Sequence, residues 1–474
     1  MTDTAGPATG PTTPSPAATT LGELRASGAT ARPVKAELRA NLLARLGRGE
    51  PSLPGMVGFE DTVLPEVERA LIAGHDLVLL GERGQGKTRL IRTLVGLLDE
   101  WTPVLTGSEL NEHPLAPISV WAHRQIAEHG DATPVGWLHR SERFGEKLAT
   151  PDTSVGDLIG DVDPIKVAEG RTLGDPETVH YGLVPRTNRG IFSVNELPDL
   201  AERIQVALLN VLEERDIQIR GYRVRLPLDL LLVASANPED YTNRGRIITP
   251  LKDRFGAEIR THYPTSLEAE IAVIRQEAHL VAEVPDHLLE ILARFTRALR
   301  SSNAVDQRSG VSARFAIAGA ETIAAAALHR AVRRGEDEGV ARVVDLETAV
   351  DVLAGKVEFE SGEEGRERQI LDHLLRVATA ETVRTHLRGI DLAPLVDAIE
   401  GGATVSTGPH VSAIGLLSAL PALGEAPTYD EICDRLEAKT DGARASAIEL
   451  ALEGLFLAQK VAKDSDATAT TYGA

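Results

Sequence analysis

Residues Gly81–Thr88 read GERGQGKT, and this stretch decides the fold. It fits the phosphate-loop pattern G-x-x-x-x-G-K-[ST] in full. A short apolar run, His75–Leu80 (HDLVLL), precedes the loop, and Thr88–Leu98 (TRLIRTLVGLL) follows it with apolar residues at helical spacing. A strand, a glycine loop and a helix in this order predict a site where backbone N–H groups and a helix N-terminus face a phosphate group.

The residues of this loop are the candidate ligands of ATP and Mg²⁺. Lys87 is expected to reach the β and γ phosphates, and Thr88 is expected to ligate Mg²⁺. A chance glycine turn is the alternative, and the agreement of motif and context argues against it. The predicted nucleotide-binding residues are Gly81, Glu82, Arg83, Gly84, Gln85, Gly86, Lys87 and Thr88.

A second apolar run ends at a pair of polar residues. The candidate buried strand Ile191–Val194 runs directly into Asn195 and Glu196. Nucleotide hydrolases usually carry two acids here, one for the magnesium ion and one for the attacking water. Glu196 can act as the general base, whereas Asn195 keeps an oxygen that can ligate Mg²⁺ but lacks the charge. A unit charge at ~4 Å is worth up to ~4 kcal/mol at an effective dielectric of 20, so we expect slow hydrolysis and a raised Mg²⁺ requirement.

Composition narrows the class of protein. The 474 residues are 42% hydrophobic and carry a net charge of −20, which disfavours nucleic acid as a partner. The single cysteine, Cys433, excludes a disulfide within the chain and is typical of a reducing cytoplasm. No apolar run approaches the ~18 residues that cross a bilayer, and the first residues do not resemble a signal peptide. We therefore expect a cytoplasmic protein with no membrane span.

The pattern of the chain predicts several parts. Residues 1–20, rich in Pro, Thr, Ala and Gly, are expected to be a disordered tail, and residues 21–55 a helical segment. Residues 56–265 alternate strands and helices, which is typical of a three-layer αβα core with a parallel sheet. Residues 266–358 are expected to form a small helical domain, and residues 359–474 a C-terminal helical domain.

Three stretches inside the core stand out. The segment 101–150 is expected to be loop-rich, and none of its histidines has the spacing of a metal pair on one helix face. Asp161–Arg189 is expected to be a long surface insertion. Asp216–Leu226 (DIQIRGYRVRL) alternates and predicts a hairpin that turns at Gly221-Tyr222. Its basic face is either solvated or contacts a partner, and it carries Arg220, Arg223 and Arg225.

Five motifs occur in one order: GERGQGKT, TSVGDLIGDVDPIKVAEG, RTNRGIFSVNELPDL, VASANPED and LKDRFG. As an ordered set they resemble the ATPase subunit of magnesium chelatase, a group of AAA+ ATPases close to the MoxR-type chaperones. The resemblance runs from about Pro54 to Val357. It implies a P-loop AAA+ core with insertions, followed by a helical lid. It also implies a homo-hexameric ring and a partner that carries a von Willebrand A domain.

The resemblance implies three further site residues. Asn237, at the end of LLLVASAN, would be the first sensor that holds the attacking water, and the alternative is a turn residue. Arg254, in LKDRFG, would reach into the ATP site of the neighbouring subunit, and the alternative is an ion pair with Asp253 or Glu258. Arg314, in VSARFAI, would be the second sensor. Its alternative is an ordinary first-turn residue, although a cation is mildly unfavourable there.

Several functions remain open at this point. The leading hypothesis is a ring-forming ATPase that remodels a protein partner. The alternatives are a genuine magnesium chelatase subunit in tetrapyrrole synthesis and a slow-turnover scaffold gated by nucleotide. An enhancer-binding transcription activator is disfavoured because the sequence shows no GAFTGA loop and no obvious helix-turn-helix.

Overall fold

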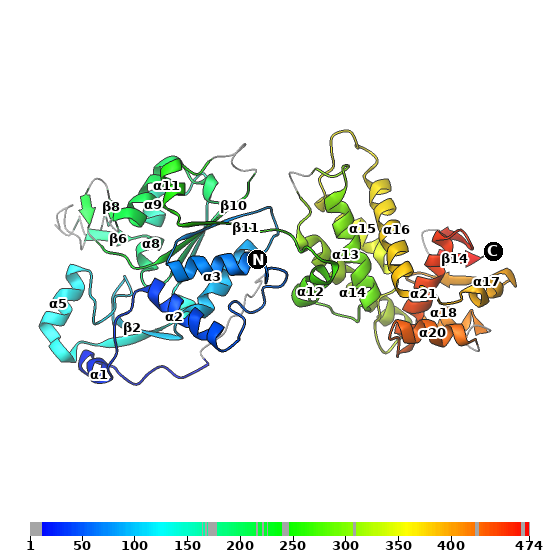
Figure 1. Cartoon of the computed structure of the whole chain (residues 1–474), viewed down its shortest axis with the longest axis horizontal. Coiled ribbons are helices and arrows are strands. Elements are labelled where there is room, and N and C mark those ends of the chain that lie inside the picture. Colours follow the sequence, from blue (N-terminus) through cyan, green and yellow to red (C-terminus); the bar gives the residue numbers. More distant parts are fainter. Residues whose placement is uncertain are drawn as a thin grey trace. The chain divides into compact units, whose positions relative to one another are not determined.

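The computed structural model describes residues 12–163, 165, 168, 178–214, 217–219, 222–224, 226–238, 246–306, 310–421, 426–465 and 470–473. The chain divides into two compact units, Met1–His262 and Tyr263–Ala474 (Figure 1). The first unit contains the phosphate loop, and the second is mainly helical.

A five-stranded sheet organises the first unit, in the order β11-β1-β10-β7-β4. All neighbouring strands run parallel, which confirms the predicted parallel sheet. The order places β1, which leads into the phosphate loop, between β11 and β10. The strands are β1 (Leu77–Leu80), β4 (Phe144–Leu148), β7 (Ile191–Asn195), β10 (Leu231–Ala236) and β11 (Ala257–Arg260).

Side chains that alternate along these strands feed two hydrophobic clusters, one on each face. Leu77, Leu79 and Val233 pack with helices α2 (Val34–Gly47), α3 (Val63–Ala73) and α4 (Lys87–Thr93). Val78, Phe192 and Val194 pack on the other face with helices α9 (Glu202–Glu214) and α11 (Thr249–Arg254). The three-layer αβα core that the sequence predicts is therefore present (Figure 1).

The segment 101–150 is more regular than the sequence analysis expected. Strands β2 (Trp101–Leu105) and β3 (Val135–His139) pair antiparallel, and helix α5 (Val120–His129) lies between them in sequence. Strand β4 then joins the main sheet beside β7. These strands are short and only partly buried, and they contain Gly, Pro or charged residues, so their periodicity is weak.

Residues 12–20 also differ from the expected disordered tail. The indole Nε1 of Trp101 donates to the Thr13 carbonyl at 3.0 Å, and that of Trp137 donates to the Ala18 carbonyl at 2.8 Å. Helix α1 (Leu21–Ala26) follows and packs Leu21 and Leu24 against the β2–β3 pair. The first helices thus cover the nucleotide-binding unit instead of forming a separate domain.

The insertion Asp161–Arg189 and the hairpin Asp216–Leu226 each contain a short pair of antiparallel strands. In Asp161–Arg189, strand β5 (Gly160–Val162) pairs with β6 (Val179–Tyr181), and residues 169–177 lie outside the described residues. Helices α6 (Val155–Leu158) and α8 (Leu183–Arg186) flank this pair. In the hairpin, β8 (Ile217–Ile219) pairs with β9 (Tyr222–Val224). Tyr222 opposes Ile219, so the turn precedes Tyr222, whereas the sequence analysis placed Tyr222 in the turn. Arg220 and Arg225 lie outside the described residues.

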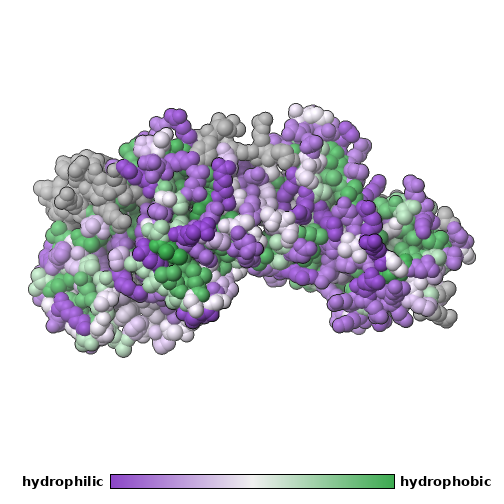
Figure 2. Space-filling view, viewed as in Figure 1, coloured by the Kyte–Doolittle hydropathy of each residue, from purple (hydrophilic) through white to green (hydrophobic). Residues whose placement is uncertain are grey.

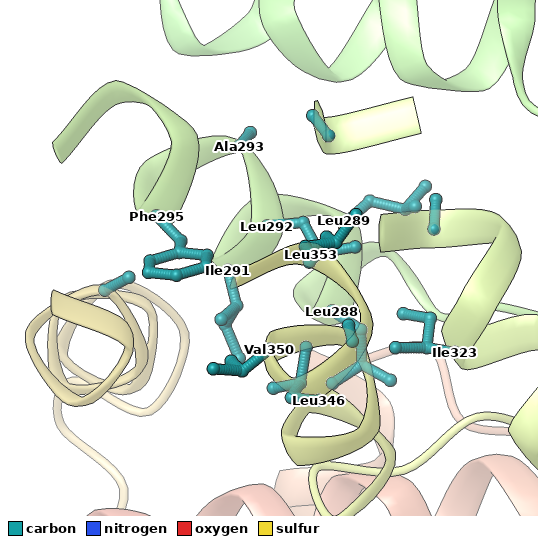
Figure 3. Packing of buried hydrophobic residues seen from close by; sticks show 14 of the residues in the cluster. Leu288, Leu289, Ile291, Leu292, Ala293, Phe295, Ile323, Leu346, Val350 and Leu353 are labelled. Atoms are coloured by element: carbon teal, nitrogen blue, oxygen red, sulfur yellow. The ribbon is translucent and has the colours of Figure 1, made fainter. Parts of the chain in front are cut away.

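The second unit is a helical bundle. One hydrophobic cluster joins α12 (Leu267–Glu277), α13 (Asp286–Ser301), α14 (Ala313–Arg334) and α15 (Asp345–Leu353). Figure 3 shows Leu288, Ile291 and Phe295 of α13 in this core. Leu371 and Ala378 of α16 (Glu367–His386) and Leu450 of α21 (Asp441–Leu457) belong to the same cluster. Residues 266–358 and 359–474 therefore share a core, although the sequence analysis expected two domains.

A second cluster holds the remaining C-terminal elements. It includes Cys433, which is buried, and burial raises the pKa of its thiol to about 11. The C-terminal region also contains a three-stranded sheet in the order β12-β14-β13, which the sequence analysis did not expect. The elements are α17 (Ala393–Glu400), β12 (Val405–Thr407), α18 (Ala413–Ser418), α20 (Pro427–Arg435), β13 (Ala462–Ser465) and β14 (Thr470–Gly473).

Helix α14 is the one described helix that is long and apolar enough to cross a membrane. Half of its apolar window is buried inside the unit, with Ala320 and Ile323 in the hydrophobic cluster. The core helix of a globular domain has the same composition, and its packing here accounts for the apolar residues. On the face drawn in Figure 2, hydrophobic residues form scattered areas among hydrophilic ones.

A buried histidine makes the second unit sensitive to acid. Burial, with a smaller contribution from the neighbouring His386, lowers the pKa of His287 to about 3. His287 is neutral in the fold and shares a 2.9 Å hydrogen bond with the Ser446 hydroxyl. An unfolded histidine takes up a proton near pH ~6.5, so stability is complete above that pH and falls below it.

We expect His287→Gln to reduce this pH dependence. Between pH ~7.5 and ~5.5 the variant should lose about 1 kcal/mol less of its free energy of unfolding than the wild type. Urea denaturation at each pH measures the difference, and His373→Gln, at an exposed position of α16, is the matched control. An unchanged pH slope in His287→Gln would contradict the expectation.

Candidate nucleotide-binding site

The loop between β1 and α4 has the backbone that a phosphate cradle requires. Gly84 and Gly86 both adopt φ of +74°, in the left-handed region that glycine occupies without strain. Gly86 is the N-cap of α4, so the helix N-terminus opens directly onto the loop. A Cβ atom on Gly81 would lie 1.9 Å from the Thr261 hydroxyl oxygen, so only glycine fits there.

Lys87 is buried at the first position of α4, with 7% of its surface exposed. Its ammonium group donates to the carbonyl oxygen of Gly81, to that of Glu82 at 2.8 Å and to Asn237 Oδ1 at 2.8 Å. The chain therefore holds the ammonium at the mouth of the loop, among oxygen atoms that a phosphate can replace.

Asn237 connects the loop to the candidate general base. It directly follows β10, at the carboxyl edge of the sheet, and is 5% exposed. Its Oδ1 accepts from Lys87, and its Nδ2 donates to Glu196 Oε2 at 3.0 Å. Three residues predicted separately from the sequence, Lys87, Asn237 and Glu196, thus form one hydrogen-bonded chain.

Glu196 has an unusual backbone. It follows β7 with φ of 57° and ψ of 47°, a left-handed conformation that costs a non-glycine residue roughly 1–2 kcal/mol. The Ser235 hydroxyl accepts from its backbone N–H at 3.4 Å. Strain of this kind concentrates at functional sites, where the surroundings hold a side chain in a required direction. Asp199 could be considered as a substitute for Asn195 at the metal, but it lies in the short 3-10 turn Leu197–Asp199 that follows.

Asn195 lies at the end of β7, and both the oxygen and the nitrogen of its amide group form hydrogen bonds. Its Oδ1 accepts from the hydroxyls of Ser193 at 3.5 Å and Ser235 at 3.3 Å. Its Nδ2 donates to Glu146 Oε1 at 2.5 Å. The sequence analysis did not single out Glu146. A charged residue within the short stretch FGEKL was the available signal.

Arg254 ends helix α11, and its side chain is 45% exposed. It lies 3.9 Å from the Asp253 carboxylate, whereas Glu258 pairs with Lys252 at 2.9 Å. The ion pair proposed as the alternative role of Arg254 is therefore long and exposed, and such pairs contribute little.

Arg314 belongs to the second unit. It is an exposed residue in the first turn of α14, and its backbone N–H donates to the N-cap Ser312 hydroxyl at 3.1 Å. The structure therefore brings Lys87, Asn195, Glu196 and Asn237 together in the first unit, whereas Arg314 belongs to the second unit.

These residues fit a nucleotide with its Mg²⁺. The glycine cradle and the buried ammonium suit a triphosphate. The Thr88 hydroxyl makes no hydrogen bond to any residue that the structure describes, so it is available as a metal ligand. The described residues contain no group of three or more His, Cys, Asp or Glu that could hold a metal ion. Mg²⁺ bound through phosphates needs only one or two protein ligands.

Sequence comparisons with known proteins support the interpretation of this region as a nucleotide-binding core. The family model described as the Sigma-54 interaction domain matches residues 171–254. The magnesium-chelatase subunit ChlI of Cyanophora paradoxa is 30% identical over 212 residues, which cover 42% of this chain and 56% of that protein. The magnesium-chelatase 38 kDa subunit of Rhodobacter capsulatus is 28% identical over 234 residues, which cover 47% and 59%. A structure of the complex between subunits BchI and BchD of magnesium chelatase aligns at 22% identity and a TM-score of 0.35, covering 65% of this chain and 95% of that chain.

The chain spans less than two thirds of the length of both curated relatives. The matched share of this chain is also shorter than the stretch from Pro54 to Val357 over which its motifs suggest the resemblance. The strand order, the phosphate loop and these sequence matches nevertheless agree. The core built around Lys87 has the αβα architecture of AAA+ proteins and is similar to these magnesium-chelatase subunits.

Proposed function

We propose that this chain is a ring-forming ATPase that couples ATP binding and hydrolysis to the remodelling of a protein partner. One observation carries the proposal: the hydrogen-bonded chain from Lys87 through Asn237 to Glu196. It joins the residue that would bind phosphate to the residues that would position and activate water.

Each residue has a defined task in this proposal. Lys87 leaves the carbonyl oxygens of the loop and binds the β and γ phosphates. Asn237 orients the attacking water, and Glu196 accepts its proton. Thr88 and Asn195 would hold Mg²⁺, which neutralises charge on the phosphates when bound. Arg254 of a neighbouring subunit and Arg314 of the same chain would stabilise charge on the γ phosphate.

The assembly and partner are proposed from the family resemblance. A role of Arg254 in the adjacent site requires a closed ring, and we propose a homo-hexamer. The partner would be a protein with a von Willebrand A domain, as in MoxR-like systems, and the location cytoplasmic. The net charge of −20 continues to disfavour nucleic acid.

Phosphate release and assembly state together test the proposal. We expect wild-type protein with ATP at high Mg²⁺ to form an oligomer on size-exclusion chromatography and to release phosphate slowly. Lys87→Ala should abolish release by removing the ammonium that binds phosphate. An exposed cation of the same unit, in Arg203→Ala, is the control. Wild-type release no faster than that of Lys87→Ala would refute hydrolysis, and a monomer under all nucleotide conditions would refute the ring.

Asn195 favours a second candidate, a scaffold in which ATP switches partner binding with little turnover. Capture of a candidate von Willebrand A protein by Glu196→Gln and by wild type separates the two. A motor should be trapped on its partner by Glu196→Gln, whereas a scaffold should bind equally in both forms. Metallation of a porphyrin with candidate partner subunits tests the chelatase alternative.

A further inference from the structure

Glu146 lies between Asn195 of the candidate site and Arg92 of helix α4. It is the third residue of β4, and its side chain is 21% exposed. Its Oε1 accepts from Asn195 Nδ2 at 2.5 Å, and its Oε2 accepts from Arg92 Nε at 3.0 Å. Arg92 belongs to α4, the helix that begins at Lys87. The carboxylate thus joins the end of β7 to the helix of the phosphate loop.

Arg92 also locates Glu146 relative to the expected metal ligand. Thr88 and Arg92 are four residues apart on α4, and residues at this spacing lie on one face of a helix. Arg92 contacts Glu146, so the carboxylate lies beside the face of α4 that carries Thr88. Thr88, the residue that would ligate Mg²⁺, therefore lies on the face of α4 from which Arg92 reaches Glu146.

Asn195 and Glu146 form a matched pair. An amide nitrogen needs an acceptor, and the Glu146 carboxylate provides one. An aspartate at position 195 would instead set two carboxylates within hydrogen-bonding distance, where like charges oppose each other. The negative charge that hydrolases usually carry at the end of this strand is thus present one strand away.

We propose that Glu146 supplies the carboxylate that holds nucleotide-bound Mg²⁺ through its water ligands. Asn195, assigned to Mg²⁺ from the sequence, then acts by positioning this carboxylate. Mg²⁺ keeps several waters in proteins, so a carboxylate can act from the outer shell. The Arg92 ion pair is partly exposed, and a hydrated cation can replace it. The proposal rests on the nucleotide site of the proposed function and explains why Asn195 need not weaken Mg²⁺ binding.

A set of charge-exchange variants tests the proposal, with Mg²⁺ titrated into protein that holds a fluorescent ATP analogue. Glu146→Gln should raise the half-saturating Mg²⁺ concentration by about 10–100-fold, the usual effect of losing an outer-shell partner. The double variant Asn195→Asp/Glu146→Gln should return towards the wild type. Arg92→Ala should lower it by removing the competing cation.

Glu142→Gln is the matched control, since Glu142 is an exposed acid four residues before Glu146. A Glu146→Gln response equal to that of Glu142→Gln would overturn the proposal. Electron paramagnetic resonance of Mn²⁺ with nucleotide reads metal binding directly. Binding of the analogue in EDTA reports the nucleotide site itself and the folding of each variant. Failure of the wild type there contradicts the proposed function, whereas retained binding with unchanged Mg²⁺ dependence contradicts this inference alone.

Discussion

Arg254→Ala should lower ATP hydrolysis by about 10³-fold or more while leaving nucleotide binding intact, if the arginine acts on the site of a neighbouring subunit. Arg254 is nearly half exposed at the end of α11, and its contact with Asp253 is long. Phosphate release and binding of a fluorescent ATP analogue, measured on the same protein, separate catalysis from binding.

Mixing inactive proteins tests action between subunits. Arg254→Ala retains Glu196, and Glu196→Gln retains Arg254, so a mixed ring contains some interfaces with both groups. In a random one-to-one mixture about a quarter of the interfaces are complete, and activity should return in that proportion. Lys252→Ala, which removes an exposed cation from the same helix, should behave as wild type. A mixture no more active than its components would show that Arg254 does not act between subunits.

Arg143→Met should destabilise the first unit by about 3–5 kcal/mol, because it leaves the Glu37 carboxylate buried without its partner. Arg143 donates to both Glu37 oxygens, at 2.7 and 2.8 Å, and to the Arg189 carbonyl at 2.7 Å. The side chains of Arg143 and Glu37 are 0% and 3% exposed. This pair fastens helix α2 to the residue before β4.

Chemical denaturation of the variants measures the effect. The double variant Glu37→Leu/Arg143→Met should recover most of the loss, since apolar residues often replace a buried ion pair without penalty. The exposed pair Arg48–Glu50 offers a matched control, and Arg48→Met should cost less than about 1 kcal/mol. A loss in Arg143→Met as small as that in Arg48→Met would contradict the expected role of the buried pair.

The parts of the core that the sequence predicts are those with strong local signals. The phosphate loop is defined by glycines at fixed spacing. Strands β1, β7 and β10 are runs of mostly apolar residues, nearly all of them buried. Asn237 and Glu196 each follow such a run. Because parallel strands end at one edge of a sheet, their proximity could be expected from order alone.

Other features depend on contacts between distant residues. The strand Phe144–Leu148 is only partly buried and has no clear alternation, so neither β4 nor Glu146 was predicted. Residues 12–20 are ordered by indole groups roughly a hundred residues away, although their composition is that of a disordered segment. The shared core of α13, α16 and α21 likewise joins helices that the sequence presents as separate domains.

The first glycine of the phosphate loop has a consequence for tracing descent. Thr261, just beyond β11, leaves little room for a side chain at Gly81. Its hydroxyl donates to the Leu80 carbonyl and to Gln85 Oε1. A lineage that ceased to use ATP would still be expected to keep this glycine, since a Cβ atom there would displace the Thr261 hydroxyl and the Gln85 side chain. The presence of Gly81 in a distant homologue would therefore indicate only that this part of the fold is kept. The presence of Lys87, whose ammonium group would bind phosphate, would be the better indicator of ATP use.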